Sequence, residues 1–85
     1  MIPMKVSIIG QGYVGLTITV FAGEHHNVIG FDKNQGVVDA LNAGKSHIEG
    51  VASSDLTELI AAGRYKATTD AADIAGSDVV VIAVP

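Results

Sequence analysis

Three glycines within six residues are the positions in this sequence whose spacing points most specifically to chemistry. The segment Gly10–Gly15 (GQGYVG) follows a short β-branched run, Lys5–Ile9, and leads into an apolar stretch without proline. Gly10 permits a tight turn out of a strand, and the missing side chain of Gly12 lets a pyrophosphate approach the backbone. Gly15 allows a helix to pack closely on a sheet. The spacing therefore predicts a phosphate-binding turn at the start of a helix.

Asp32 is the second informative position. It ends the apolar run Val28–Phe31. Asp32 follows the second predicted strand, at a sequence separation from Gly12 that lets its carboxylate accept hydrogen bonds from an adenosine ribose. Because a carboxylate repels a 2′-phosphate, the pattern predicts NAD rather than NADP, although Lys33 could tolerate some additional negative charge. A solvated acid at a strand end, or a helix cap, is the alternative interpretation of Asp32.

The sequence predicts no metal site and no catalytic group within this chain. The adjacent His25 and His26 fit a turn better than a metal site, because neighbouring residues seldom point at one ion. His25 is expected near a helix C-cap in the left-handed conformation, which histidine tolerates. No residue pairs a nucleophile with a base, and the chain contains no cysteine.

Composition limits the class of protein. A chain of 85 residues with a hydrophobic content of 48% makes one small domain and fits a sheet covered on both faces. The net charge of −4 argues against nucleic acid or an anionic membrane as a partner. The sequence shows neither an apolar run of membrane-spanning length nor a secretory signal pattern, so a cytoplasmic location is expected.

The expected elements alternate between strands and helices. Strands are predicted at Lys5–Ile9, Val28–Phe31, Tyr65–Thr68 and Val79–Val84, the third at a sheet edge and the last an apolar strand typical of a sheet interior. Helices are predicted from Tyr13 to about Gly23, after the cap Asn34 as far as Gly44, from Ser53 to Gly63, and briefly after the cap Asp70. Asp55 and Glu58 have capping-box spacing at the third helix.

Right-handed crossovers would order these strands 3-2-1-4, the first half of a Rossmann-type, doubly wound parallel α/β sheet. Ligands bind such sheets beyond the carboxyl ends of the strands, at the switch point between the first and fourth strands. Gly10–Gly15 and the pair Val84-Pro85 both fall there. A ligand cleft is therefore expected between these two segments.

Several blocks resemble the N-terminal NAD-binding domain of the nucleotide-sugar dehydrogenases, the UDP-glucose / UDP-N-acetylhexosamine 6-dehydrogenases. The similar blocks cover nearly the whole chain and are Lys5–Thr17, Gly30–Asp32, Ala40–Gly44, Ala67–Asp70 and Ile82–Pro85. Ser46–Glu49, followed by Val51 and Ser53, is more similar to the branch that acts on UDP-N-acetylated hexosamines. Two departures are Val37, where many members carry a lysine or arginine, and a Val-Pro-Thr-Pro block that stops at Pro85.

The resemblance implies an NAD-dependent, two-step oxidation of a sugar C6 alcohol to a carboxylate, which supplies uronic acids for surface polysaccharide. The family's cysteine nucleophile lies in a later part of the protein, so this chain alone is expected to be inactive and to meet a UDP-sugar only through missing domains. Residues 1–85 would be the NAD-binding half-domain, truncated after the fourth strand, of a homo-oligomeric enzyme. The expected cofactor-binding residues are Gly10, Gln11, Gly12, Tyr13, Val14, Gly15, Asp32, Lys33, Val84 and Pro85.

Other interpretations stay open at this point. An NAD-binding regulatory module, like those of potassium transport systems, would begin in a similar way but usually lacks an extra helix such as Lys45–Gly63 provides. Other dehydrogenases with a similar first half, such as hydroxyacyl-CoA or phosphogluconate types, compete within the enzyme class. An inert truncated product is the third possibility. In every case an unpaired apolar fourth strand predicts self-association or marginal stability.

Overall fold

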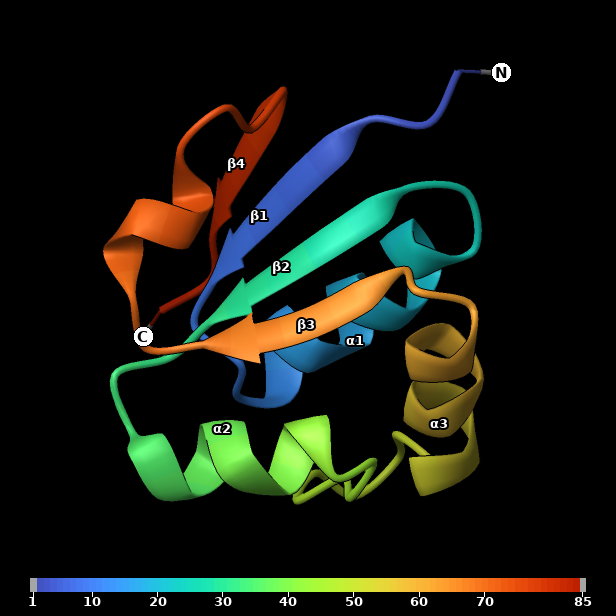
Figure 1. Ribbon diagram of the computed structural model, residues 1–85. Helices are drawn as coiled ribbons and strands as arrows, with labels where there is room; N and C mark the ends of the chain where they lie inside the picture. Colours follow the sequence, from blue (N-terminus) through green and yellow to red (C-terminus); the bar gives the residue numbers. More distant parts are fainter. Residues whose placement is uncertain (1, 85) are drawn as a thin grey trace.

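A computed structural model describes residues 2–84 as a parallel sheet with helices packed on it (Figure 1). The strands are β1 (Lys5–Ile9), β2 (Asn27–Phe31), β3 (Tyr65–Thr68) and β4 (Val79–Ile82). The α-helices are α1 (Tyr13–Gly23), α2 (Gln35–Asn42) and α3 (Ser53–Ala61), and a 3₁₀ helix, η1 (Ala71–Ile74), connects β3 to β4. The strands are parallel in the order β3-β2-β1-β4, which confirms the predicted Rossmann-type topology.

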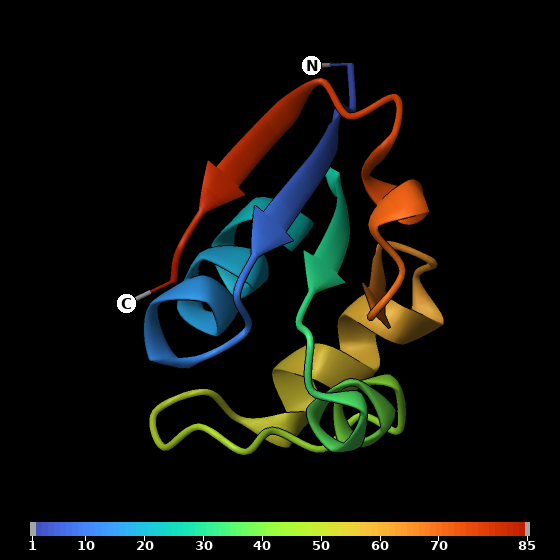
Figure 2. The same cartoon turned by 90° about the vertical axis from the view of Figure 1, so that its left-hand side faces the viewer.

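The core lies on one face of the sheet. Alternate strand residues such as Val6 and Ile8 belong to one buried cluster with residues of α1, α2 and α3. η1 lies on the opposite side of the strands (Figure 2). Ile8, Leu16, Leu41 and Leu56 are fully buried, and each such side chain contributes about 1.5–3 kcal/mol by leaving water. The core therefore holds α1 against β1 and β2, and it packs α2 and α3 against β3.

Most of the expected helix boundaries are confirmed. The side chain of Asn34 accepts a hydrogen bond from the N–H of Val37 (3.1 Å), and Asp70 does the same for Ala72 (2.9 Å). Gly44 follows α2 with a φ of +78°, a conformation that favours glycine. Local side-chain chemistry thus determines where α2 and η1 begin.

Two predictions about helix ends are wrong. α3 begins at Ser53 after Ala52, so Asp55 lies inside the first turn and no capping box with Glu58 forms. The Ser53 hydroxyl instead accepts from the N–H of Ser46 (3.0 Å) and ties the preceding loop to the helix. His25 is not left-handed either, since no non-glycine residue within 2–84 has a positive φ.

The end of α1 closes without a left-handed residue. The N–H groups of His25 and His26 both donate to the carbonyl of Ala22, at 3.2 and 2.9 Å. The imidazole Nδ1 of His26 accepts from the N–H of Met4 (3.0 Å). The two histidines therefore form the turn into β2, and one of them holds the start of β1.

The two edges of the sheet differ. On the β3 edge the side-chain amide of Asn42 donates to the carbonyl of Ala67 and accepts from its N–H, both at 2.9 Å, so a side chain occupies the place of a further strand. β4 ends at Ile82, before the predicted end at Val84, and its side chains are exposed to 49% at Val80 and 73% at Ile82. Among residues 2–84, only β1 pairs with β4.

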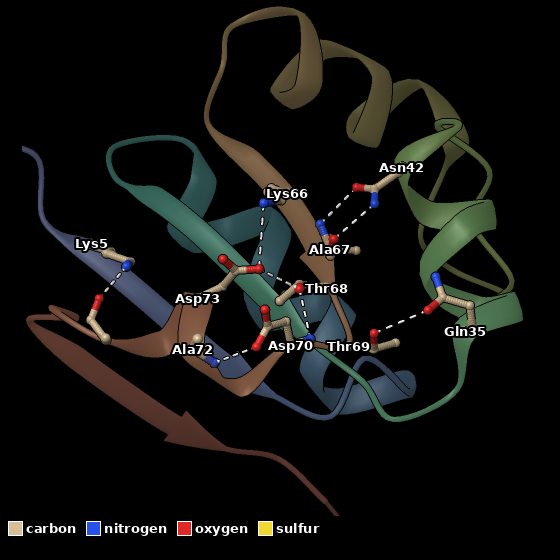
Figure 3. A network of polar contacts seen from close by, with 11 residues as sticks. Lys5, Gln35, Asn42, Lys66, Ala67, Thr68, Thr69, Asp70, Ala72 and Asp73 are labelled. Carbon is tan, nitrogen blue, oxygen red and sulfur yellow. Dashed lines mark hydrogen bonds and ion pairs between the residues drawn. The ribbon is translucent and has the colours of Figure 1, made fainter.

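η1 is anchored over the open face by a polar network at the end of β3 (Figure 3). The Thr68 hydroxyl donates to the Asp73 carboxylate (2.6 Å) and accepts from the N–H of Asp70 (3.0 Å). The Lys66 ammonium lies 3.6 Å from the same carboxylate. The Thr68 hydrogen bond, and then the positive charge of Lys66, lower the pKa of Asp73 below its usual value.

We predict that Thr68→Val raises the pKa of Asp73 toward the ordinary aspartate value of about 3.9. Because the pKa is depressed in the folded state, the stabilisation is present above the unfolded pKa and is lost as the pH falls through the folded pKa. The wild-type unfolding free energy should therefore fall more steeply in acid than that of the variant. Carboxyl-carbon NMR titration and acid unfolding measure both effects. Thr69→Val, which removes a hydroxyl that contacts Gln35 instead, should leave Asp73 unchanged, and an equal shift in that control would refute the assignment.

We also predict that the isolated chain self-associates through β4, because an apolar edge with unpaired backbone groups invites pairing. Val80→Lys places a charge on this edge and should reduce association in sedimentation experiments. Phe21→Lys is the matched control, since Phe21 is a 69% exposed apolar residue on α1. A monodisperse wild-type chain, or a loss of association in the control alone, would contradict the role of β4.

Candidate nucleotide-binding site

A cleft of about 820 Å³ opens at the carboxyl ends of β1, β2 and β4. This is the predicted switch point, because β2 and β3 lie on one side of β1, whereas β4, the next strand in the chain, lies on its other side. The glycine turn forms one wall, and the segment after β4 forms another. The lining residues are Ile9, Gly10, Gly12, Tyr13, Val14, Phe31, Asp32, Lys33, Ile82, Ala83 and Val84.

The three glycines of the turn have different roles. Gly10 has a φ of +94°, and a Cβ there would lie 2.9 Å from the carbonyl oxygen of Ala83. A Cβ on Gly15 would collide with the carbonyl oxygen of Gly10. A Cβ on Gly12 would meet no atom within 4 Å. The fold therefore requires glycine at positions 10 and 15, whereas the open space at position 12 is available to a ligand.

The first turn of α1 offers hydrogen-bond donors to this space. Gly12 is the N-cap, and within residues 2–84 no side chain caps the helix. The first intrahelical hydrogen bond runs from the N–H of Leu16 to the carbonyl of Gly12 (2.9 Å). The N–H groups that precede Leu16 in α1 therefore have no carbonyl acceptor within the helix. Together with the positive end of the helix dipole, these donors suit a pyrophosphate.

Asp32 faces the turn from the end of β2. One carboxylate oxygen accepts from the N–H of Gln11 (3.1 Å) and the other from the N–H of Asn34 (3.0 Å). Each oxygen can accept a further hydrogen bond, so the carboxylate can still bind ribose hydroxyls. Lys33 beside it is exposed and also lines the cleft.

Val37 occupies the position where many members of the resembling family carry a cation. Its N–H donates to the Asn34 side chain, and its own side chain packs against the core. As a valine, residue 37 supplies no positive charge to the cleft. Lys33 is the lysine that lines the cleft.

The structure brings most of the expected cofactor-binding residues together. Gly10, Gly12, Tyr13, Val14, Asp32, Lys33 and Val84 line the cleft, and Pro85 lies outside the described residues. Gln11 and Gly15 do not line it, because both are buried below the turn. Four further residues line the cleft that were not expected from the sequence: Ile9, Phe31, Ile82 and Ala83. The first three end their strands, so the rule that ligands bind at strand carboxyl ends could have identified them.

The site is suited to binding rather than to covalent chemistry. Its titratable side chains are Tyr13, Asp32 and Lys33, and the apolar side chains of Phe31 and Ile82 offer a packing surface for a flat ring. Within residues 2–84, no three His, Asp or Glu side chains gather where they could hold a metal ion. Across the same range no helix has the length and apolar composition that a membrane span requires.

We predict that substitutions at two of the glycines affect different properties, NADH binding at Gly12 and the stability of the fold at Gly15. Gly12→Val should strongly weaken NADH binding, because the branched side chain would project into open space in the cleft, while costing only about 1 kcal/mol of stability at an N-cap. Gly15→Ala should destabilise the fold by about 2–3 kcal/mol, because its methyl group overpacks the turn. Thermal melts and NADH titrations separate the two effects. Unchanged NADH affinity in Gly12→Val would argue against a ligand in this space.

Comparison with known proteins identifies the family of this chain. Residues 4–85 match the profile of the UDP-glucose/GDP-mannose dehydrogenase family, NAD binding domain. A UDP-glucose 6-dehydrogenase of Haloferax volcanii is 40% identical over 83 residues, which cover 96% of this chain and 19% of that protein. A UDP-N-acetyl-D-mannosamine dehydrogenase of Campylobacter jejuni is 42% identical over 83 residues, which cover 95% of this chain and 20% of that protein.

A solved structure of a UDP-glucose dehydrogenase from Pyrobaculum islandicum has a TM-score of 0.87 with 35% identity, over 98% of this chain and 20% of that one. The chain thus spans about a fifth of the length of these relatives. The resemblance drawn from the sequence blocks is confirmed, and with it NAD as the cofactor of the family. The chain belongs to the UDP-glucose/GDP-mannose dehydrogenase family, as its NAD-binding domain.

Proposed function

We propose that this chain supplies the NAD site of an enzyme that oxidises the C6 alcohol of a nucleotide-activated hexose to a carboxylate. The observation that carries the proposal is the cleft in which the uncapped start of α1 faces Asp32. Donors for a pyrophosphate and an acceptor for a ribose line one space, in which Asp32 lies next to the glycine turn. The family match over residues 4–85 favours the dehydrogenase over a regulatory module.

The residues of this chain bind and orient in the proposed reaction. The turn Gly10–Gly15 and the first N–H groups of α1 hold the pyrophosphate, and Asp32 accepts from the ribose hydroxyls. Ile82 and Val84 form the apolar wall at the end of β4. When bound, NAD supplies the acceptor for the hydride that leaves the alcohol carbon.

The catalytic groups and the sugar site belong, in this proposal, to the part of the enzyme that the relatives carry beyond the matched fifth of their length. The chain contains no cysteine, so the thiol that the family resemblance implies must come from there. Residues 1–85 are then the first half of the NAD-binding domain. A cytoplasmic location and homo-oligomeric assembly of the whole enzyme also form part of the proposal, on the resemblance alone.

The proposed substrate is a UDP-activated hexose or N-acetylhexosamine, since the relatives are named for UDP-glucose and for UDP-N-acetyl-D-mannosamine. The segment Ser46–Glu49, which resembles the N-acetylhexosamine branch, does not line the cleft. The Ser46 hydroxyl contacts the backbone of Ile48, and Ile48 and Val51 pack with the core. The hydrogen bonds of Ser46 to Ile48 and Ser53 fix the loop before α3.

A chemical-shift titration with NADH tests the proposal on the chain itself. The amides of residues 10–15 and of Asp32 should shift together, while those of α3 should not. The isolated chain should produce no NADH from NAD and UDP-glucose or UDP-N-acetylhexosamines. The absence of any shift in residues 10–15 would disprove the placement of the cofactor. Turnover by the isolated chain would disprove the proposal that the catalytic groups lie outside it.

We predict that the wild-type chain prefers NADH to NADPH and that Asp32→Asn reduces this preference. The substitution should weaken NADH binding by about 1–3 kcal/mol, the cost of losing a charge-assisted hydrogen bond. It should weaken NADPH binding less, because it also removes repulsion of the 2′-phosphate. Asp39→Asn removes the same charge from the exposed surface of α2 and serves as the control. Equal affinity of the wild type for both cofactors would contradict the role of Asp32.

A further inference from the structure

The side chain of Gln11 lies in the core instead of the cleft. It is fully buried beneath the glycine turn, and its Oε1 accepts from the hydroxyls of Tyr65 (2.8 Å) and Thr19 (3.2 Å). Gly30 on β2 makes room for it, because a Cβ at that position would collide with the Gln11 amide. A polar residue of the turn is therefore connected through the core to β3, the strand at the far edge of the sheet.

Tyr65 is the dedicated donor to this amide. The Thr19 hydroxyl has one hydrogen and also lies 3.0 Å from the carbonyl of Gly15, so it can serve only one of the two acceptors at a time. Burial, followed by the negative charge of Asp32, raises the pKa of Tyr65 above its usual value. The protonated phenol donates its hydroxyl hydrogen to Oε1 of Gln11.

The Gly10–Gln11 peptide is held from both sides. Its carbonyl oxygen, on Gly10, accepts from Nε2 of Gln11 (3.1 Å). Its N–H, on Gln11, donates to the Asp32 carboxylate (3.1 Å). In a trans peptide these two groups point in opposite directions, so rotation of the peptide would break both contacts. The Gln11 side chain and the ribose-binding acid thus restrain one peptide plane.

We propose that Tyr65 and Gln11 are positioning residues for the NAD site. Tyr65 fixes the Gln11 amide, this amide fixes the Gly10–Gln11 peptide, and the peptide N–H orients the Asp32 carboxylate toward the ribose. The proposal rests on the proposed place of NAD in the cleft. A purely structural role, in which Tyr65 only satisfies a buried amide, is the competing explanation.

The first test is Tyr65→Phe, which removes one oxygen and keeps the ring. Affinity for NADH, measured by titration of the chain, should fall about 3- to 10-fold, the effect expected of one buried hydrogen bond. Ser7→Ala is the matched control, because the fully buried Ser7 hydroxyl contacts Ser77 (2.6 Å) and lies outside the cleft. Unchanged NADH affinity in Tyr65→Phe, or an equal loss in Ser7→Ala, would overturn the proposal.

The double variant Gln11→Met/Tyr65→Phe separates positioning from stability. Replacing both partners by apolar groups removes the unpaired buried amide, so thermal stability should recover relative to Tyr65→Phe alone. NADH affinity should stay low, because the methionine side chain cannot donate a hydrogen bond to the Gly10 carbonyl. Recovery of affinity together with stability would establish the purely structural role instead. This comparison also decides the question if Tyr65→Phe by itself does not fold.

Amide hydrogen exchange without ligand distinguishes this inference from the proposed function. The N–H of Ala83, bonded to the Ile9 carbonyl at 2.8 Å, is the internal reference. Exchange of the Gln11 N–H, which is bonded to Asp32, should accelerate in Tyr65→Phe, while that of Ala83 should not. A wild-type chain that binds no NADH would refute the proposed function, but it would not affect the exchange measured at the Gln11 N–H. Unchanged exchange at Gln11 would refute the positioning chain whatever the ligand does.

Discussion

The close approach of the Gly10 carbonyl to the backbone of Gly15 is the contact on which the rest of the structure depends. It lets α1 begin directly against the end of β1, so that the first turn of the helix opens into the cleft. At its other end Gly23 lies against Leu59 of α3, where a Cβ would come within 2.6 Å of a methyl carbon. Glycine at both ends thus allows α1 to lie close to the sheet and to α3, and Leu16 and Thr19 become fully buried between them.

The one-sided core follows from this arrangement and explains where the chain is open. The three α-helices cover the same face, and on the other face polar contacts such as the Thr68–Asp73 hydrogen bond hold η1. β4 pairs with β1 but is covered little, so Val80 and Ile82 stay exposed. The β3 edge is closed by Asn42, whereas β4 carries no comparable side chain on its outer edge within residues 2–84. A small domain with a core on one face gains limited hydrophobic stabilisation, so its open edge is where association is expected.

The sequence predicts the strand order, the helices and most of the cleft, because these depend on local patterns. Glycine spacing identified the turn, and Asn34 and Asp70 identified two caps from their own chemistry. The capping box at Asp55 does not form, because α3 begins two residues earlier, at Ser53. The Ser53 hydroxyl accepts from the N–H of Ser46, a contact that the local pattern does not encode. The left-handed expectation at His25 failed because consecutive N–H groups reach the Ala22 carbonyl without it. The buried side chain of Gln11 depends on Tyr65, which is distant in the sequence, and therefore required the fold.

Asp32, the proposed ribose-binding residue, is difficult to separate from the fold. Its carboxylate accepts from Gln11 in the turn and from Asn34, the residue that caps α2. The same charge that would bind a ribose therefore joins the end of β2 to the phosphate turn and to the start of the next helix. Two backbone N–H groups hold the carboxylate in place, and such preorganisation lowers the entropic cost of ordering a side chain on binding. If the proposed function is correct, specificity for the cofactor and the geometry of the βαβ unit both depend on this one side chain.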